Sequence, residues 1–371
     1  MKVALVHDYI KEYGGAERVL ESLHEIWPDA PIYTIAYLPN FLGPHRERFK
    51  NWKIKTSFLQ FLPFKSKLIS PIRLLAPLVF KSWDFSSFDI VLVSATGAYS
   101  PNVIDSKSAV QICYCHTPPR YLYGFKTARE WKNNIFFRVF GEFANHFLRL
   151  VDYKSSQNVD FFISNSKNVK ERIKKFYKKD ATVIYPPVEI VSAEVTPSGQ
   201  DSPRSYFMAG GRIARPKNIE LIIKTFEKLK LSLKVFGRSF GGLNVSISKY
   251  PNIEMLGEIS DEEKHELMKN AKAFIFASED EDFGITPVEA MSVGMPVIAY
   301  RSGGVIESVV EDKTGIFFDE LSVESLSKAI KQFNSSKINS EDCMTQAQKF
   351  SKERFKKEIK EFVEKKVKKF N

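Results

Sequence analysis

Hydrophobic and polar positions along the chain alternate between short apolar runs and longer segments with helical spacing. The apolar runs that are typical of buried strands are residues 3–6, 32–35, 90–94, 110–115, 161–164, 206–209, 233–237, 253–256, 273–277 and 296–299. Apolar residues at helical spacing lie between several of these runs. Strands that alternate with helices favour parallel sheets covered by helices, so we predict the α/β fold class.

A loop-like segment divides the chain into two parts. The 371 residues suit two domains of ordinary size. Residues 189–205 are rich in Ser, Thr, Pro and Gly, as linkers are. We therefore expect a first domain at 1–188, a linker at 189–205 and a second domain at 206–350. Residues 351–371 have the apolar spacing of a final helix.

One stretch, residues 277–294, combines a strand end, an acidic loop and a helix start. Thr286 suits the N-cap, Pro287 the first helical position, and Gly294 the end of the helix. Such a turn lies at the carboxyl edge of a sheet, where open α/β folds bind ligands. The stretch is therefore the strongest candidate for a binding site.

Two glutamates in this stretch, Glu281 and Glu289, admit more than one interpretation. Glu289 suits a capping box and Glu281 a solvated acidic turn. The core of the loop, Phe283, Gly284 and Ile285, is uncharged, and glycine lets backbone N–H groups approach a ligand. Backbone donors between two carboxylates suit a polyhydroxylated ligand such as a sugar or a ribose.

The order of residues in this stretch resembles a known signature. Glu281-Asp-Phe-Gly-Ile-Thr-Pro-Val-Glu289-Ala-Met, followed by Gly294-Met-Pro-Val-Ile and Gly303-Gly304, looks like the retaining glycosyltransferases of family four. The Glu-Asp-Phe-Gly variant resembles the mannosyltransferase-like branch that builds bacterial surface polysaccharides. The resemblance implies the GT-B fold, in which two Rossmann-like domains face each other across a deep cleft. It also implies a last helix, here beginning near Phe355, that returns to the first domain.

The resemblance assigns donor-side roles in the second half of the chain. It implies that Glu281 and the amides of Phe283, Gly284 and Ile285 hold the sugar, and that Glu289 holds the ribose diol. A second candidate turn lies earlier in the chain, at residues 210–218. Its glycines are followed by Arg212 and Lys217, and both side chains can reach a pyrophosphate. They match the family's diphosphate-binding arginine and lysine, whereas Arg215 is a poorer match. Ile259 matches a turn that lies near the nucleobase.

The first half supplies weaker candidates. A strand, a Gly-Gly turn and a helix between residues 3 and 26 can aim backbone N–H groups at a phosphate, although a plain tight turn is an equal alternative. By resemblance, Gly15 contacts the donor and Asp8 the acceptor. His116 follows a strand in a loop stiffened by proline, and it matches the histidine that meets the donor sugar near the reacting carbon. Arg120 is a candidate for an anionic acceptor, and Asn165-Ser166 is expected to be a helix cap only.

Charge and cysteine content limit the remaining classes. The net charge of +11 calls for an anionic partner, with solubility from a lysine-rich surface as the alternative. Because no nucleic-acid-binding motif accompanies the charge, we expect lipid or phosphorylated substrate rather than nucleic acid. Three cysteines predict a reduced setting and no disulfide framework. We expect Cys113 and Cys115 to face opposite sides of a strand. We expect no metal site, because the acids at 280–282 have no partner cluster.

Two segments combine basic and aromatic residues. Residues 51–82 contain no acid, and their lysines and phenylalanines fit a surface on anionic lipid, with core packing as the alternative. Residues 131–150 have apolar residues at helical spacing, for which we expect core packing.

These observations predict a retaining, metal-independent glycosyltransferase without a cofactor. Its co-substrate is a nucleotide diphosphate sugar, with GDP-mannose expected by resemblance, and its acceptor is a lipid-linked saccharide or polysaccharide. Because no run is apolar enough to span a bilayer, we expect a cytoplasmic protein, peripheral on the inner face of the plasma membrane. The alternatives are a nucleotide-sugar epimerase or phosphorylase-like protein on the same fold, a scaffold with a degenerate site, and a lipid-surface adaptor.

Overall fold

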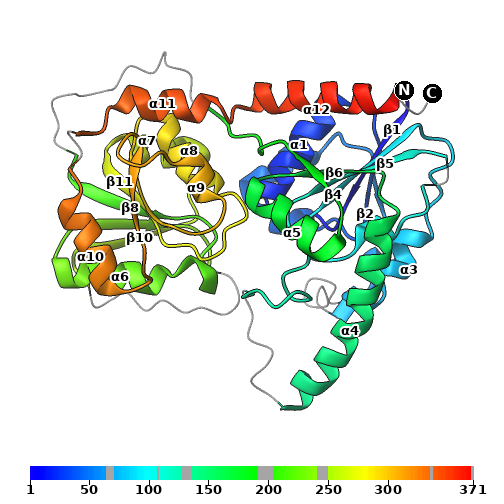
Figure 1. The fold of residues 1–371 in the computed structure, drawn as a ribbon, viewed down its shortest axis with the longest axis horizontal. Coiled ribbons are helices and arrows are strands. Elements are labelled where there is room, and N and C mark those ends of the chain that lie inside the picture. Colours follow the sequence, from blue (N-terminus) through cyan, green and yellow to red (C-terminus); the bar gives the residue numbers. More distant parts are fainter. Residues whose placement is uncertain are drawn as a thin grey trace. The chain divides into compact units, whose positions relative to one another are not determined.

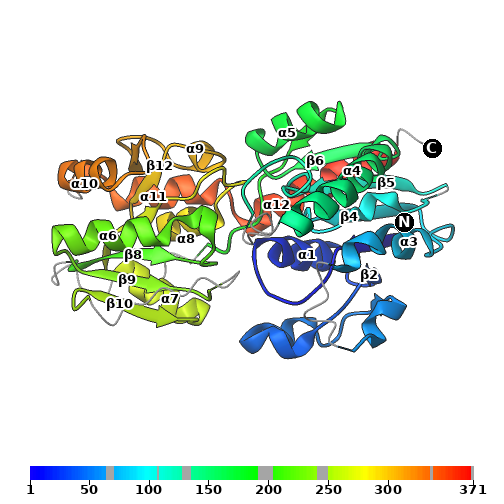
Figure 2. The ribbon, with the colours of Figure 1, turned by 90° about the horizontal axis from the view of Figure 1, so that it is seen from below.

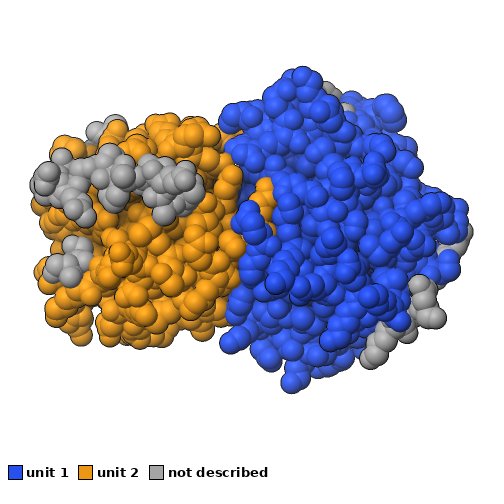
Figure 3. Space-filling view, turned by 90° about the horizontal axis from the view of Figure 1, so that it is seen from above, with its two compact units in different colours: residues 1–125, 131–187, 353–371 blue, residues 126–130, 188–352 orange. Residues whose placement is uncertain are grey.

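Two compact units make up the chain in the computed structural model. The structure describes residues 1–63, 71–106, 108–127, 135–190, 204–239, 250–334 and 337–368. The first unit comprises residues 1–125, 131–187 and 353–371, and the second comprises residues 126–130 and 188–352 (Figure 3). The expected linker lies mostly outside the described residues. None of the helices within the described ranges is both long and apolar enough to cross a bilayer.

The first unit is built on a parallel sheet (Figure 1). Its strands within the described residues are β1 Val3–His7, β2 Ile32–Thr34, β3 Ile54–Thr56, β4 Ile90–Ala95, β5 Val110–Cys115, β6 Phe161–Ser164 and β7 Ala181–Val183. They lie in the order β3-β2-β1-β4-β5-β6-β7. The strand order changes direction between β1 and β4, so the loops after these two strands meet at a topological switch point.

Helices cover both faces of this sheet. The helices are α1 Gly15–Ile26, α3 Ala76–Lys81, α4 Ile135–Gln157, α5 Lys167–Tyr177 and α12 Lys352–Val367, and the short 3-10 turns are η1 Pro39–Phe41, η2 Gly43–Phe49, η3 Phe58–Phe61, η4 Pro71–Leu74 and η5 Pro101–Val103. The apolar faces of α1 and α12 join one core layer, and those of α3 and α5 join the other. Phe355 of α12 is fully buried in the first of these layers, against Tyr114 of β5.

Strand periodicity explains the two layers. Along β4, Ile90 and Leu92 face one layer, while Val91 and Val93 face the other. The expectation that Cys113 and Cys115 face opposite sides is wrong. Both belong to the same layer, because residues two apart on a strand share a face.

The second unit has its own parallel sheet, with helices on both faces (Figure 2). Its strands within the described residues are β8 Tyr206–Gly210, β9 Leu233–Phe236, β10 Ile253–Gly257, β11 Ala271–Phe276, β12 Val297–Tyr300 and β13 Gly315–Phe318, in the order β10-β9-β8-β11-β12-β13. Its helices are α6 Ile219–Leu229, α7 Asp261–Lys269, α8 Ile285–Ser292, α9 Val305–Ser308, α10 Val323–Gln332 and α11 Ser340–Gln348, with the 3-10 turn η6 Arg215–Lys217. This order is that of Rossmann domains, with its switch point between β8 and β11. The predicted α/β fold is confirmed.

The two segments that combine basic and aromatic residues, 51–82 and 131–150, both expose large apolar side chains. Within residues 51–82, Leu59 and Phe80 are buried, whereas Phe58 and Phe61 are exposed, and residues 64–70 lie outside the described part. The expectation that residues 131–150 pack in the core is wrong for α4, because Phe140, Phe143 and Phe147 are all more than half exposed. The tertiary contacts of α4 bury its opposite side.

Candidate active site

The loops after β8 and β11 meet at the switch point of the second unit. Lys217 ends the 3-10 turn after β8, and its Nζ lies 2.7 Å from Oε2 of Glu281 in the acidic loop after β11. The Ser278 hydroxyl donates to the same carboxylate oxygen at 2.6 Å. Glu281 is therefore held by a cation and a hydroxyl, although 64 positions separate it from Lys217 along the chain.

Backbone contacts join the same two loops. The Asn218 side-chain amide donates to the Ala277 carbonyl at 2.9 Å, and the Glu279 backbone N–H donates to the Pro216 carbonyl at 2.8 Å. A charged pair alone would leave long side chains mobile. These two hydrogen bonds set the distance between the loops, so the fold itself holds Lys217 next to Glu281.

A third loop supports the acidic loop from the side. After β12, the Gly304 N–H donates to the Glu281 carbonyl at 2.8 Å. Gly303 has φ of +72°, and a Cβ at this position would lie 2.4 Å from the Glu281 carbonyl oxygen. Only glycine allows the backbones to approach this closely. The Gly-Gly turn of the signature therefore shapes the acidic loop.

Helix α8 begins earlier than the sequence predicted. Gly284, with φ of +90°, is its N-cap, and the helix runs Ile285–Ser292. Thr286 is therefore inside the helix, and the prediction that it caps the helix is wrong. The interpretation of Glu289 as a capping-box residue is wrong for the same reason, since it lies beyond the first turn. The Phe283 ring is buried against Phe350 at a centroid distance of 5.3 Å.

Glu289 instead forms a buried ion pair. Its Oε1 lies 2.9 Å from Nζ of Lys264 on α7, and the two side chains are 5% and 8% exposed. Lys264 also donates to Oδ1 of Asp261 at 2.8 Å. This arrangement fixes the Glu289 carboxylate against α7, on the same face of the sheet as α8.

The other donor-side candidates lie on the loops around this pair. Arg212 is exposed on the loop after β8. Ile259 is half-buried between β10 and Ser260, the residue that caps α7 by accepting from the Glu263 N–H. Gly211, beside Arg212, is close enough to α8 that a Cβ would lie 3.5 Å from the Thr286 hydroxyl. The structure thus gathers Arg212, Lys217, Glu281 and the start of α8 at one edge of the sheet.

In the first unit, His116 follows β5 and is held by a serine. Its Nε2 lies 2.9 Å from the Ser94 hydroxyl at the end of β4, and Nδ1 of His7 lies 3.0 Å from the same oxygen. The His7 ring is 3.7 Å from the Glu17 carboxylate. Burial lowers the pKa of His116 to about 3, with a smaller contribution from His7. The His116 imidazole is therefore neutral at neutral pH.

Asp8 follows β1 and is fully buried. Its Oδ2 accepts hydrogen bonds from the Thr96 N–H at 2.8 Å and from the Thr96 hydroxyl, and its Oδ1 has no hydrogen-bond partner in the structure. Burial raises the pKa of Asp8, and the hydrogen bonds from Thr96 oppose this. An oxygen with unused accepting capacity is what a ligand hydroxyl requires.

The remaining first-unit candidates are less defined. Gly15 is exposed and is the first residue of α1, after the N-cap Gly14. Arg120 is half-buried in the loop after His116. The predicted cap is confirmed, because the Ser166 hydroxyl accepts from the Val169 N–H at 3.0 Å. Its neighbour Asn165 does more than expected and donates to the His116 carbonyl at 3.0 Å.

Sequence reasoning missed several residues that hold the site. They are Lys264, Ser278, Ser94 and Asn165. The spacing of Asp261 and Lys264 predicts a local helix pair, but nothing in the sequence indicates that Lys264 reaches Glu289.

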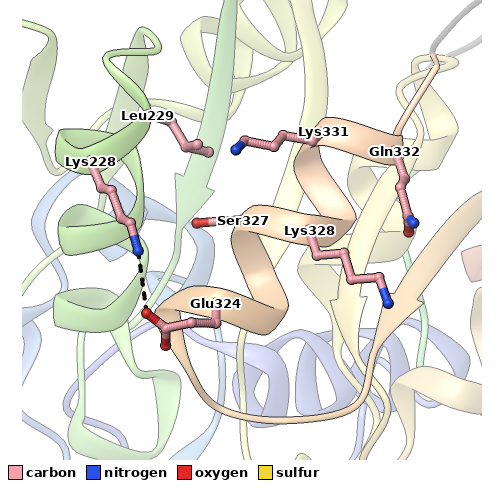
Figure 4. A pocket seen from close by; sticks show the side chains of 7 residues that line it. All are labelled: Lys228, Leu229, Glu324, Ser327, Lys328, Lys331 and Gln332. Carbon is pink, nitrogen blue, oxygen red and sulfur yellow. Dashed lines mark hydrogen bonds and ion pairs between the residues drawn. The ribbon is translucent and has the colours of Figure 1, made fainter.

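A pocket of about 520 Å³ lies elsewhere on the second unit (Figure 4). It is lined by Lys228, Leu229, Glu324, Ser327, Lys328, Lys331 and Gln332. These residues lie at the carboxyl end of α6 and on α10, whereas the loop with Arg212 and Lys217 precedes the amino end of α6 and the acidic loop precedes α8. No candidate site residue lines it. Within the described ranges, no three His, Cys, Asp or Glu side chains are grouped closely enough to hold a metal ion.

Comparisons with known proteins show what the chain is similar to. Residues 193–350 match the model of the glycosyl transferases group 1. The chain is 25% identical to the alpha-1,3/1,6-mannosyltransferase ALG2 of Kluyveromyces lactis, over 84% of this chain and 71% of that protein. It is 24% identical to the protein of the same name from Mus musculus, over 86% of this chain and 84% of that protein.

Solved structures share the fold at low identity. The sucrose-phosphate synthase of Thermosynechococcus elongatus superposes with a TM-score of 0.71 at 15% identity, covering 98% of this chain and 99% of that one. The lipopolysaccharide outer core galactosyltransferase WaaB superposes with a TM-score of 0.67 at 16% identity, covering 99% and 100%. These likenesses establish the fold. The second half of the chain thus matches the glycosyl transferases group 1, most of its length is similar to mannosyltransferases, and its fold is GT-B.

Proposed function

We propose that the protein is a retaining transferase that moves mannose from GDP-mannose to a hydroxyl of a lipid-linked saccharide or polysaccharide. The observation that carries the proposal is the contact of Lys217, Ser278 and Glu281 at the switch point of the second sheet. Glu289, held by Lys264, lies on the helix that leaves this loop. The name of the ALG2 relatives, alpha-1,3/1,6-mannosyltransferase, supports mannose as the sugar.

The leaving group decides what the site has to stabilise. Negative charge builds on the nucleoside diphosphate as its bond to the sugar breaks, and pre-positioned cations lower the energy of that state. Arg212 and Lys217 lie on one loop and can meet the two phosphates. Because they supply the positive charge, the proposal includes neither a metal ion nor another cofactor.

In this proposal, binding of the donor changes the partner of Lys217 from Glu281 to a phosphate. In the structure, Lys217 Nζ is 2.7 Å from the Glu281 carboxylate. A phosphate oxygen at Lys217 competes for this ammonium and leaves Glu281 able to accept hydrogen bonds from sugar hydroxyls. The amides of Phe283, Gly284 and Ile285 face the same ligand, and Glu289 receives the ribose diol while Ile259 contacts the base.

The first unit provides the acceptor side of the proposal. Asp8 accepts a hydrogen bond from the acceptor, and Arg120 meets an anionic group on it. The neutral His116 ring contacts the donor sugar near the reacting carbon, and the Gly15 N–H contacts the donor phosphate. The enzyme acts on the cytoplasmic face of an anionic plasma membrane, in the synthesis of surface polysaccharide such as lipopolysaccharide, and has no nucleic-acid partner.

The stereochemistry of the product tests the proposal. The enzyme is incubated with GDP-mannose and octyl α-mannoside, and the anomeric configuration of the disaccharide is determined by NMR. We expect an α-linked product together with released GDP. A β-linked product would refute retention, and conversion of the donor to another nucleotide sugar without transfer would identify an epimerase instead.

A further inference from the structure

Helix α4 carries its apolar residues on the outside of the first unit. Phe140, Phe143 and Phe147 are 71%, 65% and 51% exposed, and Val139 and Leu150 are exposed beside them. The spacing of three and four residues places these side chains along one face of the helix. We call Val139, Phe140, Phe143, Phe147 and Leu150 the α4 stripe.

The opposite face of α4 is buried, and it carries polar side chains beside Leu148 and Val151. The Ser100 hydroxyl donates to Oδ1 of Asp152 at 3.0 Å, and the Tyr123 hydroxyl donates to Oδ2 at 2.9 Å. Asn145, Ser155 and Ser156 are also buried on α4. These bonds hold the helix in this orientation, because turning the stripe inward would break them and leave the Ser100 and Tyr123 hydroxyls without their acceptor. The exposure of the stripe is therefore set by the fold.

Neighbouring elements repeat the same arrangement. The inner sides of η3, η4 and α3, through Leu59, Ile72 and Val79, join the same core layer as Val151 of α4. Their outer sides expose Phe58, Phe61, Leu74, Leu75 and Leu78. Both α3 and α4 contact η5, and Figure 1 shows them on the same side of the sheet. Several elements outside one layer thus expose large apolar side chains, and exposed apolar surface of this kind marks an interaction site.

The charges around this surface favour lipid as the partner. Lys81 follows Leu78 by three residues on α3, and Lys154 follows Leu150 by four on α4, and both are exposed. Residues 51–82 contain no acid. Of the two acids in α4, Asp152 is buried and Glu142 is exposed. Apolar side chains bordered by lysines are what binds an anionic bilayer surface, where the apolar groups enter the acyl boundary and the ammonium groups meet phosphates.

We infer that the α4 stripe, with the exposed leucines of η4 and α3, is the surface that enters an anionic lipid bilayer. This inference deepens the proposed membrane location and rests on it, but it does not depend on the donor or on the reaction. It also gives a partner to the exposed phenylalanines of α4, which the sequence pattern alone assigned to the core.

The test compares vesicle binding of two variants of the full chain. The stripe variant combines Phe140→Ser, Phe143→Ser and Phe147→Ser. The control variant combines Ile306→Ser and Val310→Ser, which are 52% and 39% exposed on the second unit. Co-sedimentation uses phosphatidylcholine vesicles with and without phosphatidylglycerol. Because all five side chains are exposed, both variants are expected to keep the wild-type circular dichroism spectrum.

We expect wild type and control to bind the vesicles that contain phosphatidylglycerol, more weakly as salt is raised. The stripe variant should bind at least about tenfold more weakly, since burial of each phenylalanine contributes to the partition energy. Equal binding of all three proteins would overturn the inference. A wild-type dimer that the stripe variant cannot form, with no vesicle binding, would overturn it in favour of a second copy of the chain.

A second measurement places the stripe in the lipid directly. In Phe143→Trp, the emission of the introduced tryptophan should shift to the blue when these vesicles are added. In Phe41→Trp, at an exposed site on η1, it should not shift. An unshifted signal at position 143 would overturn the inference. Calorimetry with GDP-mannose separates the two proposals. If the stripe variant binds the donor but not the vesicles, the transferase proposal stays intact. If the wild type binds the vesicles but no donor, only this inference remains.

Discussion

The buried Lys264–Glu289 pair yields a prediction with a defined magnitude. In Lys264→Met, a side chain of similar length keeps the packing but removes the ammonium group 2.9 Å from Glu289. The carboxylate is left in a place that is only 5% exposed. Removing one partner of a buried ion pair costs about 3–5 kcal/mol of unfolding free energy. We expect a loss of that size in equilibrium urea unfolding.

A matched control lies on the same helix. Lys269 pairs with Glu266 at 3.6 Å, and that glutamate is 57% exposed. Lys269→Met should therefore change the unfolding free energy by at most about 1 kcal/mol, as exposed pairs do. The double variant Lys264→Met with Glu289→Leu should recover much of the loss, because it removes both charges. Equal losses for Lys264→Met and Lys269→Met would refute the reasoning.

The same variant tests whether Lys264 positions Glu289 for a ligand. At a temperature where Lys264→Met remains folded, it should bind GDP more weakly than wild type and than Lys269→Met. Glu289→Gln should show a similar weakening, since the amide cannot replace the carboxylate at a ribose diol. If Lys264→Met binds GDP as wild type does, Lys264 has a structural role only.

Two further predictions concern the acidic loop and the first unit. Gly303→Ala should destabilise the second unit and weaken donor binding more than Gly257→Ala. Both glycines have positive φ, but a Cβ at 303 would lie 2.4 Å from the Glu281 carbonyl oxygen, whereas a Cβ at 257 would have nothing within 4 Å. Equal effects of the two substitutions in calorimetry and urea unfolding would contradict this. Because the pKa of His116 is lowered from 6.5 to about 3 in the folded protein, the unfolded chain takes up a proton that the folded one does not between these values. Stability should therefore fall as the pH is lowered from 7 to 5, by about 2 kcal/mol from this group. His116→Gln should lack that part of the loss, and an unchanged pH dependence in the variant would show that His116 protonates freely in the fold.

The sequence predicted the strands well because burial on both faces leaves a clear signature. The apolar runs at 110–115 and 161–164 coincide with β5 and β6, since a strand between two core layers is apolar at most of its positions. The short strands β3 and β13 were missed. Edge strands such as these are covered less, so their apolar runs are shorter.

The orientation of α4 shows where periodicity stops being informative. Spacing reveals that Phe140, Phe143 and Phe147 share a face, but not what that face meets. The answer depends on Ser100 and Tyr123, which hold Asp152 from other segments. The contact between Lys264 and Glu289 was missed for the same reason, because it joins two helices that only the sheet brings together.

The Lys217–Glu281 contact could be anticipated in outline. The order of elements places both residues after strands that border a switch point, and the resemblance gives both a role at the donor. The sequence does not show that Ser278 shares the carboxylate, or that the Gly303–Gly304 backbone lies directly against the loop. Both depend on approach distances that only folding sets.

Calorimetric titration with a panel of nucleotide sugars, GDP-mannose and UDP-sugars among them, tests whether the loop with Arg212 holds the diphosphate of the donor. The proteins are wild type, Arg212→Ala and, as a control on the same loop, Arg215→Ala. We expect wild type to bind GDP-mannose and Arg212→Ala to bind it about 10–100-fold more weakly, because charge-assisted hydrogen bonds to a diphosphate are lost. Arg215→Ala should stay closer to wild type. Absence of binding to every donor, or equal binding by Arg212→Ala and wild type, would contradict the placement of the diphosphate at this loop.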